Sequence, residues 1–277
     1  MRNPAVSGTF YPSRKQELEG LISECFAKEA GKPAPGGGPG LAAVVSPHAG
    51  YVYSGWVAAF AFREIARAFK SPPVFVIAGP NHTGIGSPVA MSRQDWQTPL
   101  GVAKNDSELG KAIKDNSRLI DFDESAHEFE HSVEVQIPFL QYVYGQAEIV
   151  PICMGRQDLA AARDLAEAVA KAKAELKREA VLIASSDFTH FESAESALAR
   201  DAPAIEMLEK LDAEGFERAR ERKNASICGH GPITAAIHYA RLAGCSKGEL
   251  LKYANSGDVT GDYGQVVAYC SAAFRTG

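Results

Sequence analysis

The chain has 277 residues, of which 45% are hydrophobic and 23% are charged, a composition typical of a globular domain. Its 29 Lys and Arg against 34 Asp and Glu give a formal net charge of −5, which disfavours general nucleic-acid binding because no basic surplus can neutralise phosphates. No uncharged apolar run of about 18 residues occurs, so we expect no membrane-spanning helix.

The start of the chain and the cysteines favour a cytoplasmic protein. The first twelve residues lack an apolar stretch and include Pro4, so we expect no secretory signal. The five cysteines are an odd number without a CxxC pair, which disfavours a disulfide framework.

Helical and extended patterns alternate along the chain. A helix is predicted over 13–30, opened by a capping box of Ser13 and Gln16, and a Gly/Pro-rich connector follows over 31–40. In chain order we then predict strand 41–46, helix 54–69, strands 74–78 and 88–91, helices 105–116 and 131–144 (kinked or interrupted at Pro138), strand 148–154, helix 158–177, strand 180–186, two helices within 193–223, helix 232–243, and strands 249–255 and 264–274.

Short apolar strands that alternate with helices are typical of a largely parallel sheet covered on both faces. We therefore expect one domain over 1–277, a three-layer α/β/α arrangement with a central, mostly parallel mixed sheet.

Polar residues follow three of the predicted strands. His48 comes after 41–46, His82 after 74–78, and Asp187 and His190 after 180–186. In open α/β sheets, ligands bind outside the carboxyl ends of the strands, so these residues predict a site at one sheet edge. Two histidines with one anionic ligand form a pattern typical of non-haem metal sites.

The third metal ligand is either Asp187 or Cys228. Cys228 lies in a Gly-rich turn that opens a predicted helix, where the helix dipole and exposed N–H groups stabilise a thiolate. A buried structural cysteine at a tight turn is the alternative. Asp187 and His190, three residues apart, are predicted to form a general base in which the carboxylate orients the imidazole.

A competing pattern lies further along the chain. His127-Glu128-Phe129-Glu130-His131 fits H-E-x-x-H, the zinc metallopeptidase motif. That motif needs a regular helix, and the acidic residues before His127 lack an apolar stripe. We keep a zinc peptidase acting through His127 and His131 as the weakest alternative.

Several blocks resemble the Memo family, whose prokaryotic members are called AmmeMemoRadiSam system protein B. The blocks are RNPAVSGTFYP (2–12), SPHAGYVYSG (46–55), GPNHTG (79–84), TPLG (98–101), EHSVEVQIPFL (130–140), PICMG (151–155), SSDFTH (185–190) and ICGHGPI (227–233). They occur in order over nearly the whole chain.

This resemblance implies a fold similar to the LigB-type class III extradiol dioxygenases, which use non-haem iron. It implies that His48 and His82 are metal ligands and that His190 acts as the catalytic base. Cys228 falls where those dioxygenases place a glutamate ligand. A thiolate is softer than a carboxylate and widens the choice of metal, so we expect iron first, with copper or zinc as alternatives.

The resemblance also suggests residues around the metal and partners for the protein. Tyr51, Asn81, Glu130 and His131 are expected to line the cleft. We expect redox or oxygenase-type chemistry on an unidentified small molecule or peptide, and functional association with AMMECR-type and radical SAM proteins. The alternative is a non-catalytic module that binds a peptide or protein in the same cleft.

Overall fold

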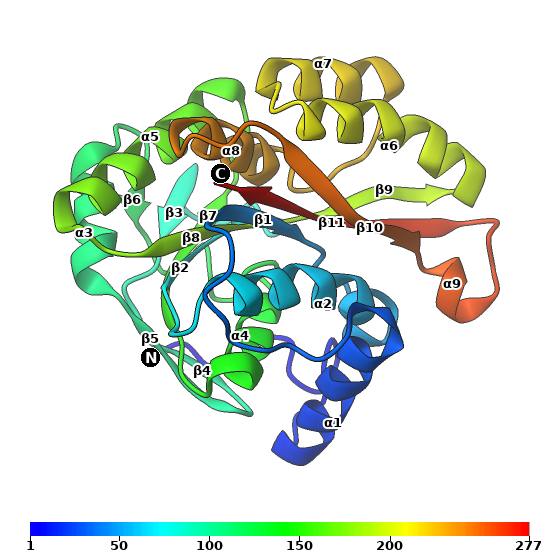
Figure 1. The fold of residues 1–277 in the computed structure, drawn as a ribbon, viewed down its shortest axis with the longest axis horizontal. Helices are drawn as coiled ribbons and strands as arrows, with labels where there is room; N and C mark the ends of the chain where they lie inside the picture. The colour runs from blue at the N-terminus through cyan, green and yellow to red at the C-terminus, as the bar shows by residue number, and fades with distance from the viewer. Residues whose placement is uncertain (277) are drawn as a thin grey trace.

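An eleven-stranded mixed sheet runs through the computed structural model, which describes residues 1–276 (Figure 1). Its strands are β1 (Leu41–Ser46), β2 (Val74–Pro80), β3 (Val89–Met91), β4 (Trp96–Thr98), β5 (Gly101–Asn105), β6 (Asp121–Phe122), β7 (Glu148–Met154), β8 (Ala180–Ser185), β9 (Asp187–Glu192), β10 (Gly248–Asn255) and β11 (Val266–Arg275). The helices are α1 (Lys15–Cys25), α2 (Tyr51–Ala68), α3 (Ser107–Asn116), α4 (Ile137–Tyr144), α5 (Leu159–Leu176), α6 (Ala194–Glu209), α7 (Ala213–Lys223), α8 (His230–Leu242) and α9 (Gly257–Thr260).

The centre of the sheet is parallel and its margins are antiparallel. The order is β10-β11-β1-β8-β2-β7-β3-β6, in which β1, β8, β2 and β7 run parallel to one another. β11 pairs antiparallel with β1, β10 and β9, while β3 pairs antiparallel with β7. The parallel strands therefore all end at one edge of the sheet, where residues that follow them meet.

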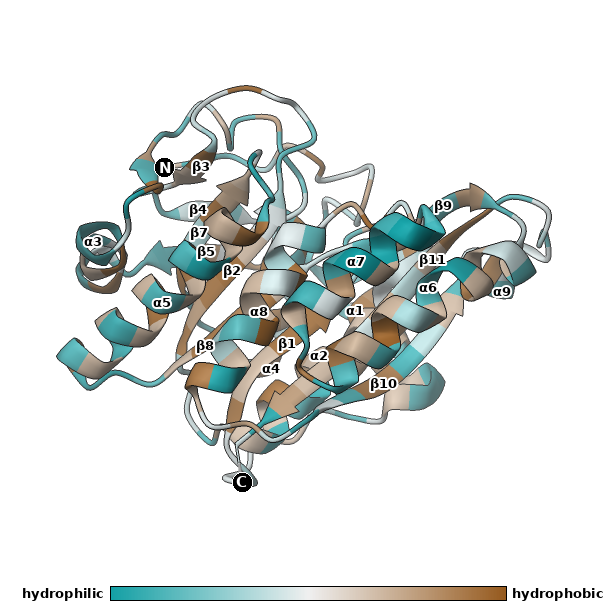
Figure 2. Ribbon diagram, turned by 90° about the horizontal axis from the view of Figure 1, so that it is seen from above, coloured by the Kyte–Doolittle hydropathy of each residue, from teal (hydrophilic) through white to brown (hydrophobic). Residues whose placement is uncertain are grey.

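Helices cover both faces of the sheet and give two apolar cores (Figures 1 and 2). One core packs α3, α5 and α8 against the sheet, and the other packs α1, α2 and α4 against the opposite face. β1, β2 and β8 are buried along their whole length, which explains why they read as continuous apolar runs in the sequence.

Most predicted elements are confirmed within a few residues of their expected bounds. Predicted strand 148–154 is β7, and predicted helix 158–177 is α5, which begins after the side-chain cap Asp158. The predicted acidic or amide cap of helix 105–116 is Asp106, whose carboxylate accepts a hydrogen bond from the Leu109 N–H. Residues 31–40 hold no helix or strand, as expected, and Gly36 and Gly38 donate to carbonyls at the end of α2.

Other parts of the chain differ from the prediction. Predicted helix 13–30 ends at Cys25 and continues as a π-turn, and Ser13 does not cap it. Predicted helix 131–144 begins with turns and a 3₁₀ turn over Glu134–Gln136, so Pro138 lies in the first turn of α4 and does not kink it. The residues after β8, for which the sequence predicts no strand, form strand β9, because β11 offers them a pairing edge. The short strands β4, β5 and β6 have no clear sequence pattern.

The chain ends lie at opposite ends of the domain. Arg2 bridges to Trp96 of β4, whereas the Thr276 N–H donates to the Gly40 carbonyl before β1 (Figure 2). Among residues 1–276, no helix combines the length and the apolar character that crossing a bilayer requires. Within the same residues, all five cysteines are free thiols.

The turn before α8 packs directly on the end of β8, and this contact generates the first prediction. A Cβ at Gly229 would overlap the Ser185 carbonyl oxygen and lie 2.7 Å from Cβ of Ser186. Gly229→Ala should therefore lower the free energy of unfolding by about 1–3 kcal/mol in urea titrations. The control Gly20→Ala, on an exposed face of α1 with no neighbour within 4 Å, should raise it by up to about 1 kcal/mol. Equal effects of the two changes would contradict the close approach.

Candidate metal centre

The parallel register of β1 and β8 brings the first two site residues together. Ser46 pairs with Ser185, so the residues after each strand lie side by side. The backbone N–H of His48 donates to Oδ1 of Asp187 at 2.8 Å. This contact fixes the loop that leads from β1 into α2, and it directs the His48 side chain toward the carboxyl edge of the sheet.

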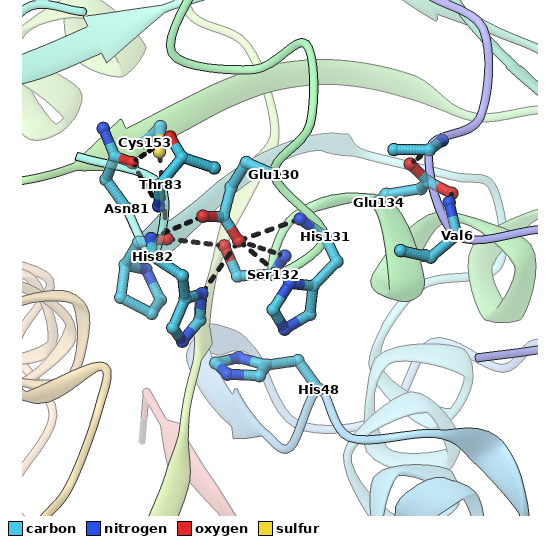
Figure 3. Close-up of polar contacts among 12 residues, drawn as sticks. Val6, His48, Asn81, His82, Thr83, Glu130, His131, Ser132, Glu134 and Cys153 are labelled. Carbon is cyan, nitrogen blue, oxygen red and sulfur yellow. Dashed lines mark hydrogen bonds and ion pairs between the residues drawn. The ribbon is translucent and has the colours of Figure 1, made fainter. Parts of the chain in front are cut away.

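Three imidazoles meet at this edge. One ring nitrogen from each of His48, His82 and His131 lies within 4.8 Å of the others, close enough to share one metal ion. The ring centroids are 4.6 Å apart for His82 and His131, 5.2 Å for His48 and His82, and 5.4 Å for His48 and His131. Figure 3 shows the three rings facing a common space. His48 is buried, whereas His82 and His131 are partly open to solvent.

The carboxylate of Glu130 holds two of these histidines. Oε1 lies 2.9 Å from Nδ1 of His82 and accepts the backbone N–H groups of His131 and Ser132, while Oε2 accepts the His82 N–H (Figure 3). An ionised carboxylate only accepts, so His82 carries its proton on Nδ1 and leaves the Nε2 lone pair free. Nδ1 of His131 lies 3.4 Å from the same oxygen.

A hydroxyl sets the tautomer of His48. Ser185 Oγ donates to the Ser132 carbonyl at 2.6 Å and accepts from Nε2 of Gln136 at 2.9 Å. Its only proton is therefore used, so the 2.9 Å contact with Nδ1 of His48 must be a donation from the imidazole. Nε2 of His48 is left as the metal-binding lone pair. This arrangement, in which one ring nitrogen is held by a neighbour, is typical of metal-ligating histidines.

The loop that carries Glu130 and His131 is docked on the sheet by Ser132. Ser132 Oγ donates to the Pro80 carbonyl at the end of β2. Gly79 permits this approach, since a Cβ there would lie 2.9 Å from Cβ of Ser132. A loop distant in sequence thereby reaches the strand ends.

Burial keeps His48 and His131 neutral at physiological pH. Burial, with smaller effects of His131 and His82, holds the pKa of His48 well below its usual range. Burial also lowers the pKa of His131 to about 4, although Glu130 opposes the shift. For Glu130, burial opposes ionisation, but the hydrogen bonds that His82 and the Ser132 N–H donate outweigh it and keep its pKa well below the usual range. Neutral imidazoles beside a carboxylate suit a cation.

Cys228 lies next to this group. Its Sγ is 3.2 Å from Nε2 of His48, and it accepts the Asp187 N–H at 3.3 Å. Burial and the Asp187 carboxylate raise the pKa of the thiol, so without a cation the S–H donates to His48. Burial likewise raises the pKa of Asp187 to about 7, partly offset by the N–H groups of His48 and Ala49. A bound metal cation would instead favour the deprotonated thiolate of Cys228.

His190 and Asp187 do not form the predicted pair. Both lie on β9, and residues three apart on a strand are separated by about 10 Å. Asp187 instead bonds the backbone of His48, while Nδ1 of His190 donates to the Ser226 carbonyl at 3.0 Å. Nε2 of His190 therefore carries a lone pair, and burial lowers the pKa of this histidine, with a smaller effect of His82.

Two residues expected to line the cleft stabilise the surrounding backbone. Tyr51 is buried, and its hydroxyl donates to the Val135 carbonyl, so the expectation that it lines the cleft is not met. Asn81 uses its side chain to shape the loop around His82: it accepts from Thr83 and Gly84 and donates to the Ile85 carbonyl.

The structure contradicts the metallopeptidase alternative. Residues 127–131 form turns and bends, so the two histidines do not share one helix face. The ring of His127 is buried edge-on against Trp96, and it is not part of the histidine group. The five-residue pattern is therefore a chance match.

Comparison with known proteins shows the family of the chain and agrees with its fold. A family described as "Memo-like protein" matches residues 2–273. The chain belongs to the Memo-like family. A MEMO1 family protein of Methanopyrus kandleri is 48% identical over 100% of this chain and 99% of its own, and one of Methanosarcina acetivorans is 45% identical over 98% of both. A solved structure of an uncharacterized protein from Escherichia coli K12 shares the fold, with a TM-score of 0.50, 12% identity, and coverage of 84% of this chain and 99% of the other.

Several residues that support the site in this Memo-like chain had no sequence signal. Ser185, Ser132 and Gln136 read as ordinary polar residues, although all three lie in blocks that resemble the family. Their role depends on contacts across more than 40 residues of chain.

A buried carboxylate anchors the strand that carries Asp187 and His190, and it generates the second prediction. Asp201 of α6 accepts hydrogen bonds from Thr189 of β9 and from Tyr253 of β10. Burial outweighs these bonds and raises the Asp201 pKa from 3.8 to about 6. The folded state thus binds a proton more tightly than the unfolded state, and this stabilisation is complete below pH 4 and lost as the pH rises through 6.

Asp201→Asn should remove this dependence. In urea titrations between pH 4 and 7, the stability of the wild type relative to Asp201→Asn should fall with rising pH, by about 1.4 kcal/mol for each unit of pKa difference. Parallel curves for the two proteins would contradict the raised pKa.

Proposed function

We propose that the protein binds one divalent or redox metal ion at this edge of the sheet. His48, His82 and His131 supply imidazole nitrogens, and Cys228 adds a sulfur donor beside His48. The convergence of the three ring nitrogens within 4.8 Å is the observation that carries the proposal. The fixed tautomers of His48 and His82 support it, because both leave Nε2 free.

The donor set suits a borderline metal. Imidazole binds iron, copper and zinc, and a thiolate shifts the preference away from magnesium and calcium. We propose iron first, with copper or zinc as alternatives. Membership of the Memo-like family and the likeness to a solved structure agree with the fold that positions this site.

We further propose redox or oxygenase-type chemistry on an unidentified small molecule or peptide. The bound metal would supply electron transfer or Lewis acidity. His82 and His131 face solvent in part, so a substrate can approach them. Nε2 of His190 would accept a proton, because its Nδ1 is held by the Ser226 carbonyl. Asp187 would act as a positioning residue through the backbone of His48.

A binding module that uses the same cleft is the second candidate. Phe129 and Phe191 are 63% and 74% exposed, and they adjoin Glu130 and His190 respectively. Exposed aromatic side chains beside a site are typical of surfaces that recognise a partner. This candidate requires no stoichiometric metal, so metal binding separates the two.

The third prediction concerns metal binding itself. Protein purified anaerobically without chelators should contain close to one equivalent of iron, copper or zinc by mass spectrometry. His48→Ala and His82→Ala should each weaken Co(II) binding by more than about 100-fold, because each removes a direct ligand. Loss of a residue that only supports a ligand costs less, about 10- to 100-fold. Glu130→Gln should weaken it by about 10- to 100-fold, because an amide cannot accept from all of the N–H groups around it.

His238→Ala is the matched control, since His238 lies on α8 outside the histidine group. It should leave Co(II) affinity unchanged. A wild-type protein that takes up no metal after anaerobic reconstitution with Fe(II) would overturn the metalloprotein proposal and leave the binding module.

The fourth prediction tests the sulfur donor. Sγ of Cys228 is within reach of a cation held by Nε2 of His48, because the two atoms are 3.2 Å apart. The Co(II) protein should therefore show a sulfur-to-metal charge-transfer absorption in the near ultraviolet, and Cys228→Ser should lose it. His131→Ala should keep that band while weakening Co(II) binding. A spectrum unchanged in Cys228→Ser would remove Cys228 from the ligand set.

A further inference from the structure

The first residues of the chain form a strap along the candidate metal centre. This N-terminal strap, defined as residues 2–11, contains most of the block RNPAVSGTFYP. The block lies outside the strands of the sheet and contains none of the candidate metal ligands. Main-chain contacts hold part of the strap's course: isolated bridges join Arg2 to Trp96 and Ser7 to Tyr11, and the Arg2 N–H donates to the Asp95 carbonyl. Side-chain contacts join the strap to the loop that carries Glu130 and His131.

Arg2 forms hydrogen bonds to the main chain of the loop that carries Glu130 and His131. Its Nε donates to the His127 carbonyl at 2.7 Å, and its Nη2 donates to the Glu130 carbonyl at 2.6 Å. The guanidinium lies over the Trp96 ring, 4.0 Å from the centroid. Arg2 thus fixes the main chain of the same residue whose carboxylate orients His82.

Glu134 anchors the other side of the strap. It forms a buried ion pair with Nη1 of Arg2 at 2.7 Å. It also accepts the N–H of Val6 (Figure 3). Its other partners are the N–H of Ala5 and the hydroxyl of Tyr11. A buried carboxylate is costly unless it is satisfied in this way, so the strap and Glu134 form one unit.

The end of the strap contacts the histidines more directly. The ring of Phe10 packs against that of His131 at a centroid distance of 4.7 Å. The Phe10 carbonyl accepts the N–H of Tyr51, three residues after His48. The strap therefore contacts the chain segments of two metal-ligand candidates and holds the backbone of Glu130, whose carboxylate orients the third.

We propose that Arg2 is a positioning residue of the metal centre and that the N-terminal strap is part of the site's support. The proposal rests on the metal-binding function above. Arg2 acts through Glu130: it fixes the Glu130 backbone, the Glu130 carboxylate fixes His82, and the backbone that follows carries His131. Lysine cannot replace it, because one ammonium cannot reach the carbonyls of His127 and Glu130 and the carboxylate of Glu134 together.

The experiment compares Arg2→Ala and Arg2→Lys with a matched control. Arg275→Ala removes an arginine that pairs with the buried Glu64 at 2.7 Å, at the opposite end of β1 from His48. Co(II) affinity and the Co(II) visible spectrum are measured for each variant, together with unfolding in urea. Both Arg2 variants should bind Co(II) about 10- to 100-fold more weakly, with an altered visible spectrum. Arg275→Ala should lose stability but keep the affinity and spectrum of the wild type.

A metal-independent readout separates this proposal from the metal function. In the apo protein, imidazole ¹⁵N spectra should show His82 as the Nδ1–H tautomer, and Arg2→Lys should shift its population. If Arg2→Lys shifts the His82 tautomer but the wild type binds no Co(II), the positioning role of Arg2 is supported and the metal function is overturned. If folded Arg2→Lys keeps the Co(II) affinity and the His82 tautomer of the wild type, the role of Arg2 is overturned. If Arg2→Ala does not fold, Arg2→Lys alone provides the test.

Discussion

One buried carboxylate organises the candidate centre. Glu130 accepts hydrogen bonds from the imidazole and backbone of His82 and from the backbone of His131 and Ser132. A buried carboxylate stays ionised only where such donors surround it, so its contacts are energetically coupled. The fixed negative charge then orients the imidazole of His82 and favours a cation among the three ring nitrogens.

The sheet supplies the rigid frame for this carboxylate. The parallel strands β1, β2 and β8 end together, which brings the residues that follow them, His48, His82 and Asp187, to one edge. The loop that carries Glu130 and His131 is then docked on the strand ends through Ser132. The rigidity of the centre therefore derives from buried strands on one side and from a hydrogen-bonded loop on the other.

The support beneath the loop is polar and buried, unlike the apolar layers on the two faces of the sheet. Arg2 and Glu134 remove two charges from water, and a single unsatisfied partner would be costly. Apolar contacts of similar volume could give comparable stability, but they lack direction. The directed bonds of Arg2 to the His127 and Glu130 carbonyls set the course of the loop that carries two site residues.

The sequence by itself determined the alternating strands and helices, the parallel centre of the sheet, the family, and the placement of His48 and His82 at one edge. These features follow from local hydropathy and from what comes directly after each buried strand. Only the tertiary structure decided that His131 joins the histidine group and that Asp187 is separate from His190. It also decided the imidazole tautomers that Ser185 and Glu130 set. They depend on hydrogen bonds between residues far apart in the chain, and no local pattern specifies which distant donor will meet which acceptor.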